Sequence, residues 1–277
     1  MKFRISPLWW PVIGIFSPVI APFLVLRYIR YKKNFQLADE LNQERLHSAE
    51  TFEIPELEFL EMTVIVDEKA EDGFLGDAGV SYFFRSNQGS LLLDVGFGPD
   101  RPTFAHNTAK LKLKMDQIDA LCISHLHIDH MGGLKAVRSN NVTVPEEFGL
   151  PKGQPCFVPG KAKAIGFNGV IVKGPLLLTG GIATTGPLSR SMFFLGMCDE
   201  QALFARLKGK GFLILFIHSS IIIIIFPIFC CIKFLITNPS KNMNTNKRTN
   251  HRRKLSSYPC SNSGIITSLI KNFKTDH

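Results

Sequence analysis

The stretch His125-Leu-His-Ile-Asp-His130 is the most informative part of this chain. Three imidazoles and one carboxylate fall within six positions, after an apolar run and just before Gly132-Gly133. Imidazole and carboxylate are the side chains that usually bind zinc and similar divalent ions. Four such groups would be costly to place together in a core, because each needs a polar partner once it is buried. A metal ion gives one partner to all of them, so the stretch predicts a metal site.

The sequence before this stretch is typical of β-strands. Residues 118–124 form an apolar run that leads directly to His125, and we expect a buried strand there. Residues 80–84 and 91–95 are apolar runs joined by a turn containing Asn87 and Gly89, which predicts a hairpin. Further strands are expected at residues 60–66, 157–158 and 170–172, and from residue 211 onward.

Helices are expected at residues 103–112 and directly after Gly133. The pattern also predicts a helix at residues 199–208, because acids lie in its first turn, basic residues lie in its last turn and Gly209 follows.

Two motifs in this order resemble those of metallo-β-lactamase-fold hydrolases. The first is Leu91-Leu-Leu-Asp94-Val-Gly96, a strand that ends in Asp-x-Gly, and the second is the histidine stretch. The resemblance covers about residues 57–215 and implies an α/β protein, an αββα metallo-β-lactamase sandwich with a two-metal site at one edge of its sheets. Within the superfamily, three features resemble the 7,8-dihydropterin-6-methyl-aminobenzene ribofuranosyl phosphate synthase-like branch: His106-Asn107, Leu178-Thr-Gly180 and the predicted helix before Gly209-Lys-Gly211.

The resemblance also implies roles for the motif residues. His125 and His127 would hold a first divalent metal ion, and Asp129 and His130 a second, with zinc favoured and iron or manganese as alternatives. A metal-bound hydroxide would be the nucleophile. Asp129 and Asp94 are the catalytic candidates. Asp129 can hold a metal or take a proton, and Asp94 would orient a ligand or a metal-bound water. The alternative for Asp94 is a turn-forming role.

Other polar residues are weaker candidates. His106 could line the pocket or be structural, and the Gly-rich loop could bind an anionic small-molecule substrate or be an ordinary solvated loop. The loop residues in question are Thr179, Thr184, Thr185, Ser189 and Arg190.

The chain departs from the family pattern after residue 211. A third histidine for the first metal, a bridging aspartate and a last histidine are expected there, and His218 alone lies near a matching position, without the preceding Gly-Cys. The domain at residues 56–211 is therefore expected to be partial, a sandwich that is C-terminally incomplete.

The N-terminal sequence favours a membrane anchor. Residues 7–26 carry no charge, Trp9 and Trp10 lie at one end, and basic residues follow, which predicts a transmembrane helix within residues 1–34. A cleaved signal peptide and a buried core helix are the alternatives. The positive flank predicts a single-pass membrane protein whose domain faces the cytoplasm, with residues 35–55 as a stalk helix and linker. The net charge of +9 comes from the two ends of the chain, which argues against a nucleic-acid surface on the domain.

The composition changes sharply at residue 212. Residues 212–277 contain no Ala, no Val, one Gly and one acid, and residues 221–225 are all Ile. We interpret residues from about 213 onward as out-of-frame or non-coding sequence. The rival interpretation is a second membrane helix at residues 212–236 followed by a basic disordered tail at residues 237–277.

Several functions follow from these patterns. The first is a membrane-anchored, metal-dependent hydrolase of the metallo-β-lactamase fold, or a pterin-phosphate synthase-type transferase of the same fold. The second is a truncated or frame-shifted homologue without activity, and the third is a membrane scaffold. The six cysteines are scattered and are expected to be reduced thiols.

Overall fold

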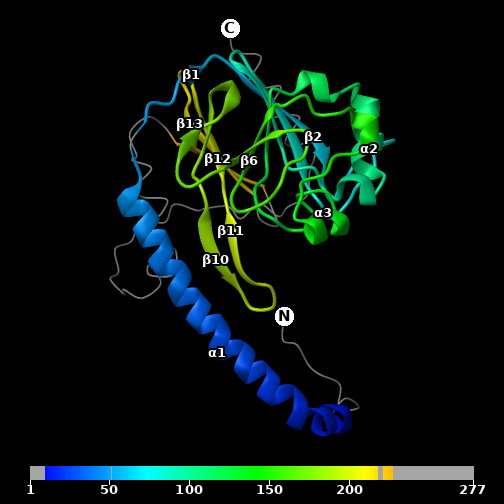
Figure 1. Cartoon of the computed structure of the whole chain (residues 1–277), viewed down its shortest axis with the longest axis vertical. Coiled ribbons are helices and arrows are strands. Elements are labelled where there is room, and N and C mark those ends of the chain that lie inside the picture. The colour runs from blue at the N-terminus through cyan, green and yellow to red at the C-terminus, as the bar shows by residue number, and fades with distance from the viewer. Residues whose placement is uncertain (1–9, 51, 218–220, 227–277) are drawn as a thin grey trace, which may run out of the picture. The chain divides into compact units, whose positions relative to one another are not determined.

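A computed structural model describes residues 10–50, 52–217 and 221–226 (Figure 1). The chain divides into two compact units. The first unit joins the residues up to His47 with Ser189–Cys198, and the second joins Ser48–Leu188 with the residues from Asp199 onward.

The first unit is a long helix with a two-stranded sheet against it. Helix α1 spans Trp10–Ser48, and strands β10 (Leu188–Met192) and β11 (Gly196–Glu200) pair with each other. The side-chain amide of Asn42 donates to the Ser189 carbonyl (2.8 Å) and accepts from the Ser189 amide (2.7 Å), as a neighbouring strand would. The helix predicted at the start of residues 35–55 is confirmed as the C-terminal part of α1.

The predicted transmembrane helix is wrong for the residues that the structure describes. No helix there carries an apolar stretch long enough to cross a membrane. The prediction of a single-pass membrane protein with a cytoplasmic domain is therefore contradicted.

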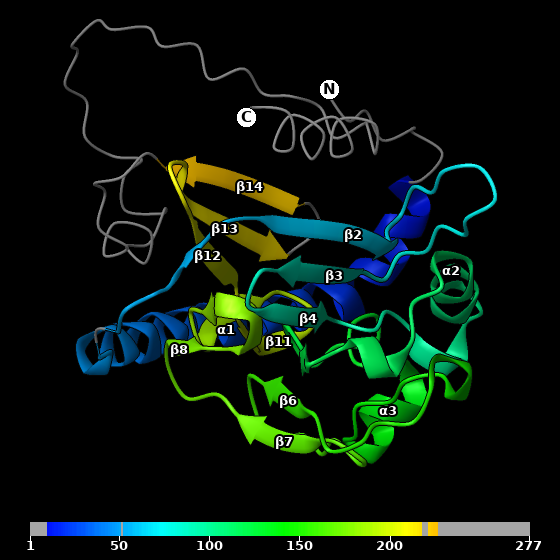
Figure 2. The ribbon, with the colours of Figure 1, turned by 90° about the horizontal axis from the view of Figure 1, so that it is seen from above.

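The second unit contains two sheets (Figure 2). The first sheet has the strand order β2-β3-β4-β5-β6-β7, antiparallel from β2 to β4 and parallel from β4 to β7. The predicted hairpin is confirmed as β3 and β4. The strands span Leu60–Val66 (β2), Ser81–Ser86 (β3), Gly89–Leu93 (β4), Ala120–Cys122 (β5), Pro155–Val158 (β6) and Asn168–Ile171 (β7).

The second sheet has the order β14-β13-β12-β9-β8, and the short strand β1 pairs with β12 in parallel. The bounds are Glu56–Leu57 (β1), Leu176–Leu177 (β8), Ile182–Thr184 (β9), Leu203–Leu207 (β12), Gly211–Ile217 (β13) and Ile221–Phe226 (β14). Strands β13 and β14 are antiparallel, so the membrane helix considered for residues 212–236 is not formed by the described part of that segment. His218 and the tail at residues 237–277 lie outside the described residues.

The helix predicted at residues 199–208 is wrong, because strands β11 and β12 occupy these positions. In β12, Leu203, Ala205 and Leu207 alternate toward the core and are 0%, 2% and 8% exposed. The strand lies between β13 and β9, so cross-strand pairing on both sides outweighs the helical propensity of the sequence. One of the three features that resembled the pterin synthase-like branch is thereby lost.

Apolar residues on both faces of the first sheet define three layers. One core lies between the two sheets and includes Leu91, Leu93 and Leu203, and the other lies between the first sheet and the helices and includes Phe104 and Phe148. The helices are α2 (Thr103–Leu111) and α3 (Leu134–Ser139), with 3-10 turns at Gly98–Asp100, Met115–Gln117, Glu146–Phe148 and Thr179–Gly181.

This mixed α/β arrangement is consistent with the expected sandwich. A second α-helical layer is not found among the described residues of this unit, and it stays a prediction.

Candidate metal centre

The parallel pairing of β4 and β5 brings the two sequence motifs together. Leu93 pairs with Cys122 at the carboxyl ends of both strands, so Asp94 and Ser124-His125 emerge at the same edge of the sheet. The Asp94 amide donates to the Cys122 carbonyl at 2.9 Å, which continues the ladder by one step. The strand ends alone therefore place a carboxylate beside the first histidine.

The histidine motif folds into a tight turn that rests on the chain after β4. Within the turn, the amides of His130 and Met131 both donate to the His127 carbonyl, at 3.2 and 3.1 Å. The His130 carbonyl accepts from the Val95 amide at 2.9 Å. These bonds return the chain toward β4 and place His130 above Asp94.

Gly132 and Gly133 allow this turn to pack closely. Their φ angles are 108° and 95°, in the region that favours glycine. A Cβ atom at Gly132 would overlap the Thr143 carbonyl, and one at Gly133 would overlap the Asp100 carboxylate. A side chain at either position would force the histidine turn away from its support.

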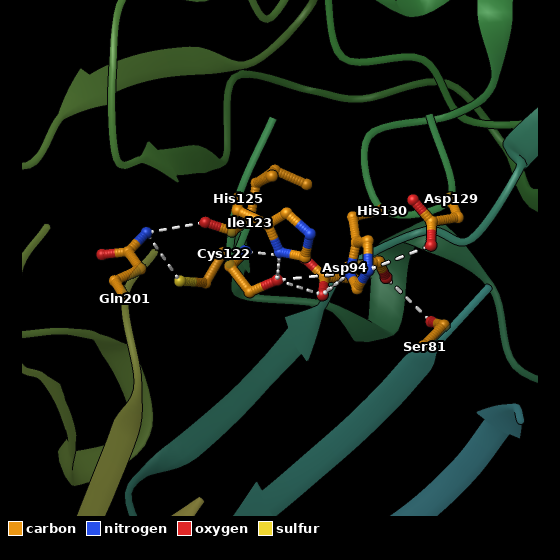
Figure 3. A network of polar contacts seen from close by, with 9 residues as sticks. Ser81, Asp94, Cys122, Ile123, His125, Asp129, His130 and Gln201 are labelled. Carbon is orange, nitrogen blue, oxygen red and sulfur yellow. Dashed lines mark hydrogen bonds and ion pairs between the residues drawn. The ribbon is translucent and has the colours of Figure 1, made fainter. Parts of the chain in front are cut away.

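Asp94 is the centre of the polar network (Figure 3). It is fully buried, and one carboxylate oxygen accepts from the Ser124 amide at 2.6 Å. The other accepts from the Ser124 hydroxyl at 2.6 Å and lies 2.7 Å from His130 Nδ1. Its φ of 57° is unusual for a residue with a side chain, although aspartate tolerates this region better than most. The conformation turns the carboxylate toward the histidines.

The network determines which imidazole nitrogens are available for a ligand. His130 Nδ1 donates to Asp94, so Nε2 is the acceptor when the imidazole is neutral. The Ser124 hydroxyl donates its single proton to Asp94. Its oxygen can therefore only accept from His125 Nδ1, which lies 3.0 Å away. These bonds favour the Nδ1-protonated tautomer of both neutral histidines, in which Nε2 is the nitrogen that can bind a metal.

Three of the four predicted metal ligands come together. Ligand atoms of His125, Asp129 and His130 all lie within 4.8 Å of one another. The His125 and His130 rings are 3.8 Å apart at their centroids, and His130 Nε2 is 3.5 Å from an Asp129 carboxylate oxygen. Both histidines are buried, at 2% and 6% exposure, and the Asp129 side chain is 35% exposed. His127 lies outside this group, with its ring 4.5 Å from that of His125.

In the metal-free site, the electrostatics favour a negatively charged Asp129 and a positively charged His130. Burial alone would lower the pKa of His130, but the Asp94 and Asp129 carboxylates outweigh it and raise the pKa to about 9. Burial alone would raise the pKa of Asp129, but its hydrogen bond to His130 and the nearby positive charge lower it to about 2. A cation between these side chains would replace the histidine proton.

The weaker candidates from the sequence do not join this group. His106 Nε2 lies 3.1 Å from the Gly73 carbonyl, which favours a structural role. Thr184 is fully buried and donates to Gln201, while Ser189 and Arg190 belong to β10. The Gly-rich loop therefore does not gather its polar residues into one anion site.

Sequence reasoning missed two members of the network, Ser124 and Gln201. Ser124 directly precedes His125, and its position between a strand and a metal motif was an available signal. Gln201 donates from Nε2 to the Ile123 carbonyl at 2.8 Å and carried no local signal.

The donor set fits a divalent metal ion. Two imidazole nitrogens and a carboxylate oxygen are common zinc ligands, and each histidine has a hydrogen-bond partner on its other nitrogen. Three protein ligands leave room for water or substrate, as catalytic zinc sites require.

A comparison with protein families agrees with this geometry. Residues 75–147 match the model of the metallo-beta-lactamase superfamily. The match includes Asp94, Ser124 and the whole histidine turn. The superfamily resemblance expected from the sequence is thereby confirmed for this segment, which is about a quarter of the chain. No curated relative matches the chain.

Solved structures give a weaker likeness. Tm1679, described as a metal-dependent hydrolase of the beta-lactamase superfamily, is 20% identical with a TM-score of 0.38, and the match covers 56% of this chain and 64% of Tm1679. AiiA from B. thuringiensis, solved with N-decanoyl-L-homoserine at its active site, is 14% identical with a TM-score of 0.38 and coverage of 60% and 77%. YhfI from Bacillus subtilis, a metallo-beta-lactamase fold protein, is 18% identical with a TM-score of 0.32 and coverage of 52% and 57%. At these TM-scores the likeness carries no argument about activity.

Proposed function

We propose that this chain is a metal-dependent hydrolase that acts on a small-molecule substrate. The observation that carries the proposal is the convergence of His125, Asp129 and His130 to within 4.8 Å, with Asp94 and Ser124 fixing the two imidazoles. We further propose His127 as the fourth ligand and two divalent ions as the full complement, zinc first and iron or manganese as alternatives.

In the proposed reaction, the metal, the residues that position its ligands and Asp129 would have different roles. A bound divalent ion supplies a Lewis acid and lowers the pKa of water toward neutrality. Asp94 positions His130 and, through Ser124, His125, each by a contact to the Nδ1 atom of its imidazole. Asp129 is the most exposed carboxylate of the group and can hold a metal or accept a proton at a carboxylate oxygen.

The test begins with metal content. The purified full chain is loaded with zinc, passed through a desalting column and assayed by elemental analysis, beside His130→Ala and the matched control His106→Ala. We expect one to two zinc ions per chain in the wild type and in His106→Ala, and a loss of at least one in His130→Ala. Equal zinc content in all three would contradict the proposed site.

Activity is measured in a second step with chromogenic carboxylic esters, lactones and phosphodiesters. Hydrolysis should require added metal and fall by about 100-fold or more in His130→Ala.

A second candidate function is a metal-binding homologue without hydrolytic activity. It is favoured by the fact that, in the part of the chain that the structure describes, a single cluster of three metal-ligating side chains occurs. Tight zinc binding with no turnover of any substrate class would support this alternative over the hydrolase.

A further inference from the structure

We propose that Gln201 is a positioning residue for the metal centre, through which the second sheet fixes the strand end that carries His125. The inference rests on the proposed metal site and assigns a role to a residue that is not a ligand. The observation behind it is a series of buried hydrogen bonds that runs from Thr184 in β9 through Gln201, just before β12, to the end of β5.

Gln201 lies just before β12 and is 3% exposed. Its main-chain amide donates to the Ser124 carbonyl at 2.9 Å, and its side-chain Nε2 donates to the Ile123 carbonyl at 2.8 Å. Longer contacts of 3.4 Å join Nε2 to the Phe157 carbonyl and to Cys122 Sγ. Figure 3 shows Gln201 on the side of His125 opposite to Asp129.

The orientation of the Gln201 amide is determined by its neighbours. Oε1 accepts from the Thr184 hydroxyl at 2.8 Å, and that hydroxyl in turn accepts from the Gly186 amide at 3.1 Å. On the other side, Nε2 faces carbonyl oxygens, which only accept. A flipped amide would set oxygen against oxygen, so one orientation satisfies both ends.

The position of these bonds explains why they matter for the site. β5 ends at Cys122, and the carbonyls of Ile123 and Ser124 lie beyond its last ladder pair. Buried carbonyls without a donor are costly, and Gln201 supplies a donor to each. Asp94 holds the Ser124 amide and hydroxyl from the first sheet, so the residue before His125 is held from two sides.

This arrangement should set the direction of the His125 imidazole. Loss of the Gln201 side chain would free the Ile123 carbonyl and let the strand end rotate, while Asp94 and His130 keep their own contacts. The expected result is a weaker and distorted metal site in a folded protein.

The test compares Gln201→Met, which keeps the volume and removes both polar ends, with the control Thr108→Val. Thr108 is also buried, and its hydroxyl donates within α2 to the Phe104 carbonyl at 2.8 Å. Metal affinity is measured with a competing chelator, the visible spectrum of the cobalt(II)-loaded protein reports ligand geometry, and thermal unfolding reports stability. We expect Gln201→Met to bind metal about 10- to 100-fold more weakly with an altered cobalt spectrum. Thr108→Val should lower the melting temperature and leave the affinity and the spectrum near those of the wild type.

The outcomes separate this inference from the proposed function. Gln201→Met with wild-type affinity and spectrum, however low its melting temperature, would overturn the positioning role. If the wild type itself binds no metal, the proposed function fails. The role of Gln201 is then tested by NMR, from the imidazole nitrogen resonances of the metal-free protein. A shift of the His125 signals in Gln201→Met, with those of His106 unchanged, supports the role, and unchanged His125 signals reject it.

Discussion

The two sheets of the second unit contribute to the candidate site in different ways. The first sheet supplies all the predicted metal ligands, and its strand ends carry a buried carboxylate with three close polar contacts. The second sheet supplies apolar core residues such as Leu203 and one polar connection through Gln201. The contrast indicates that the first sheet supplies the metal ligands, whereas the second sheet supports the strand end before His125 through Gln201 and contributes stability through packing between the two sheets.

The largest effect is expected at the centre of the polar network. Asp94→Ala would leave the Ser124 amide and His130 Nδ1 without their acceptor in a buried place, and it would put alanine at a φ of 57°. We expect the free energy of unfolding to fall by about 3–5 kcal/mol, as for other broken buried pairs. Metal binding should be lost as well, which elemental analysis would show.

Asp94→Asn is the companion variant, because asparagine keeps the shape and tolerates the left-handed backbone. It should lose less stability than Asp94→Ala in urea denaturation. A loss below about 1 kcal/mol in Asp94→Ala would mean that the network is not the support of the first sheet's strand ends.

A core substitution in the second sheet should separate stability from metal binding. Leu203 is fully buried between the sheets, and Leu203→Ala is expected to lower the free energy of unfolding by about 3 kcal/mol. Its zinc affinity should stay within about a factor of two of the wild type, because the site does not contact this side chain. Leu203→Met, which conserves volume, should cost less than about 1.5 kcal/mol and serves as the control. A parallel loss of zinc affinity would contradict the division of roles between the sheets.

Much of the first sheet could be predicted from the sequence because its signals are local. Alternating and apolar runs, a turn at Asn87-Gly89 and the motif spacing sufficed for the strands and for the candidate ligands. Helix α2 also lies close to its predicted bounds.

In the second sheet, the strand expected from residue 211 onward is confirmed as β13, but the other strands could not be predicted in the same way. Residues 203–207 carry helix-forming side chains, and only their pairing with β9 and β13, far away in the sequence, makes them a strand. The role of Gln201 likewise depends on an approach to Ile123 across 78 positions of the chain, which no local pattern contains.

The glycine pair of the histidine turn offers a smaller and more local test. Gly132→Ala should lower the free energy of unfolding by about 2 kcal/mol, from an unfavourable φ and a clash of its Cβ with the Thr143 carbonyl. Gly153 is the matched control, because its φ is 82° and a Cβ there would meet nothing within 4 Å. Gly153→Ala should cost about 1 kcal/mol from the backbone alone. Equal losses in the two variants, measured by urea denaturation, would show that the turn can move away from Thr143 without cost.

The smallest effect on stability, with a large effect on the metal, is expected at Ser124. Ser124→Ala removes the hydroxyl that donates to Asp94 and accepts from His125 Nδ1, which should cost about 1.5 kcal/mol and weaken zinc binding about 10- to 100-fold. Ser139→Ala is the control: its exposed hydroxyl returns to the Lys135 carbonyl within α3, and neither stability nor zinc affinity should change measurably.

Wild-type zinc affinity in Ser124→Ala would show that the tautomer of His125 does not depend on this hydroxyl. The first sheet would then hold its two histidines independently, His130 through Asp94 and His125 through its main chain alone. In that case the second sheet, which holds that main chain through Gln201, would matter more to the metal than the contrast between the sheets suggests.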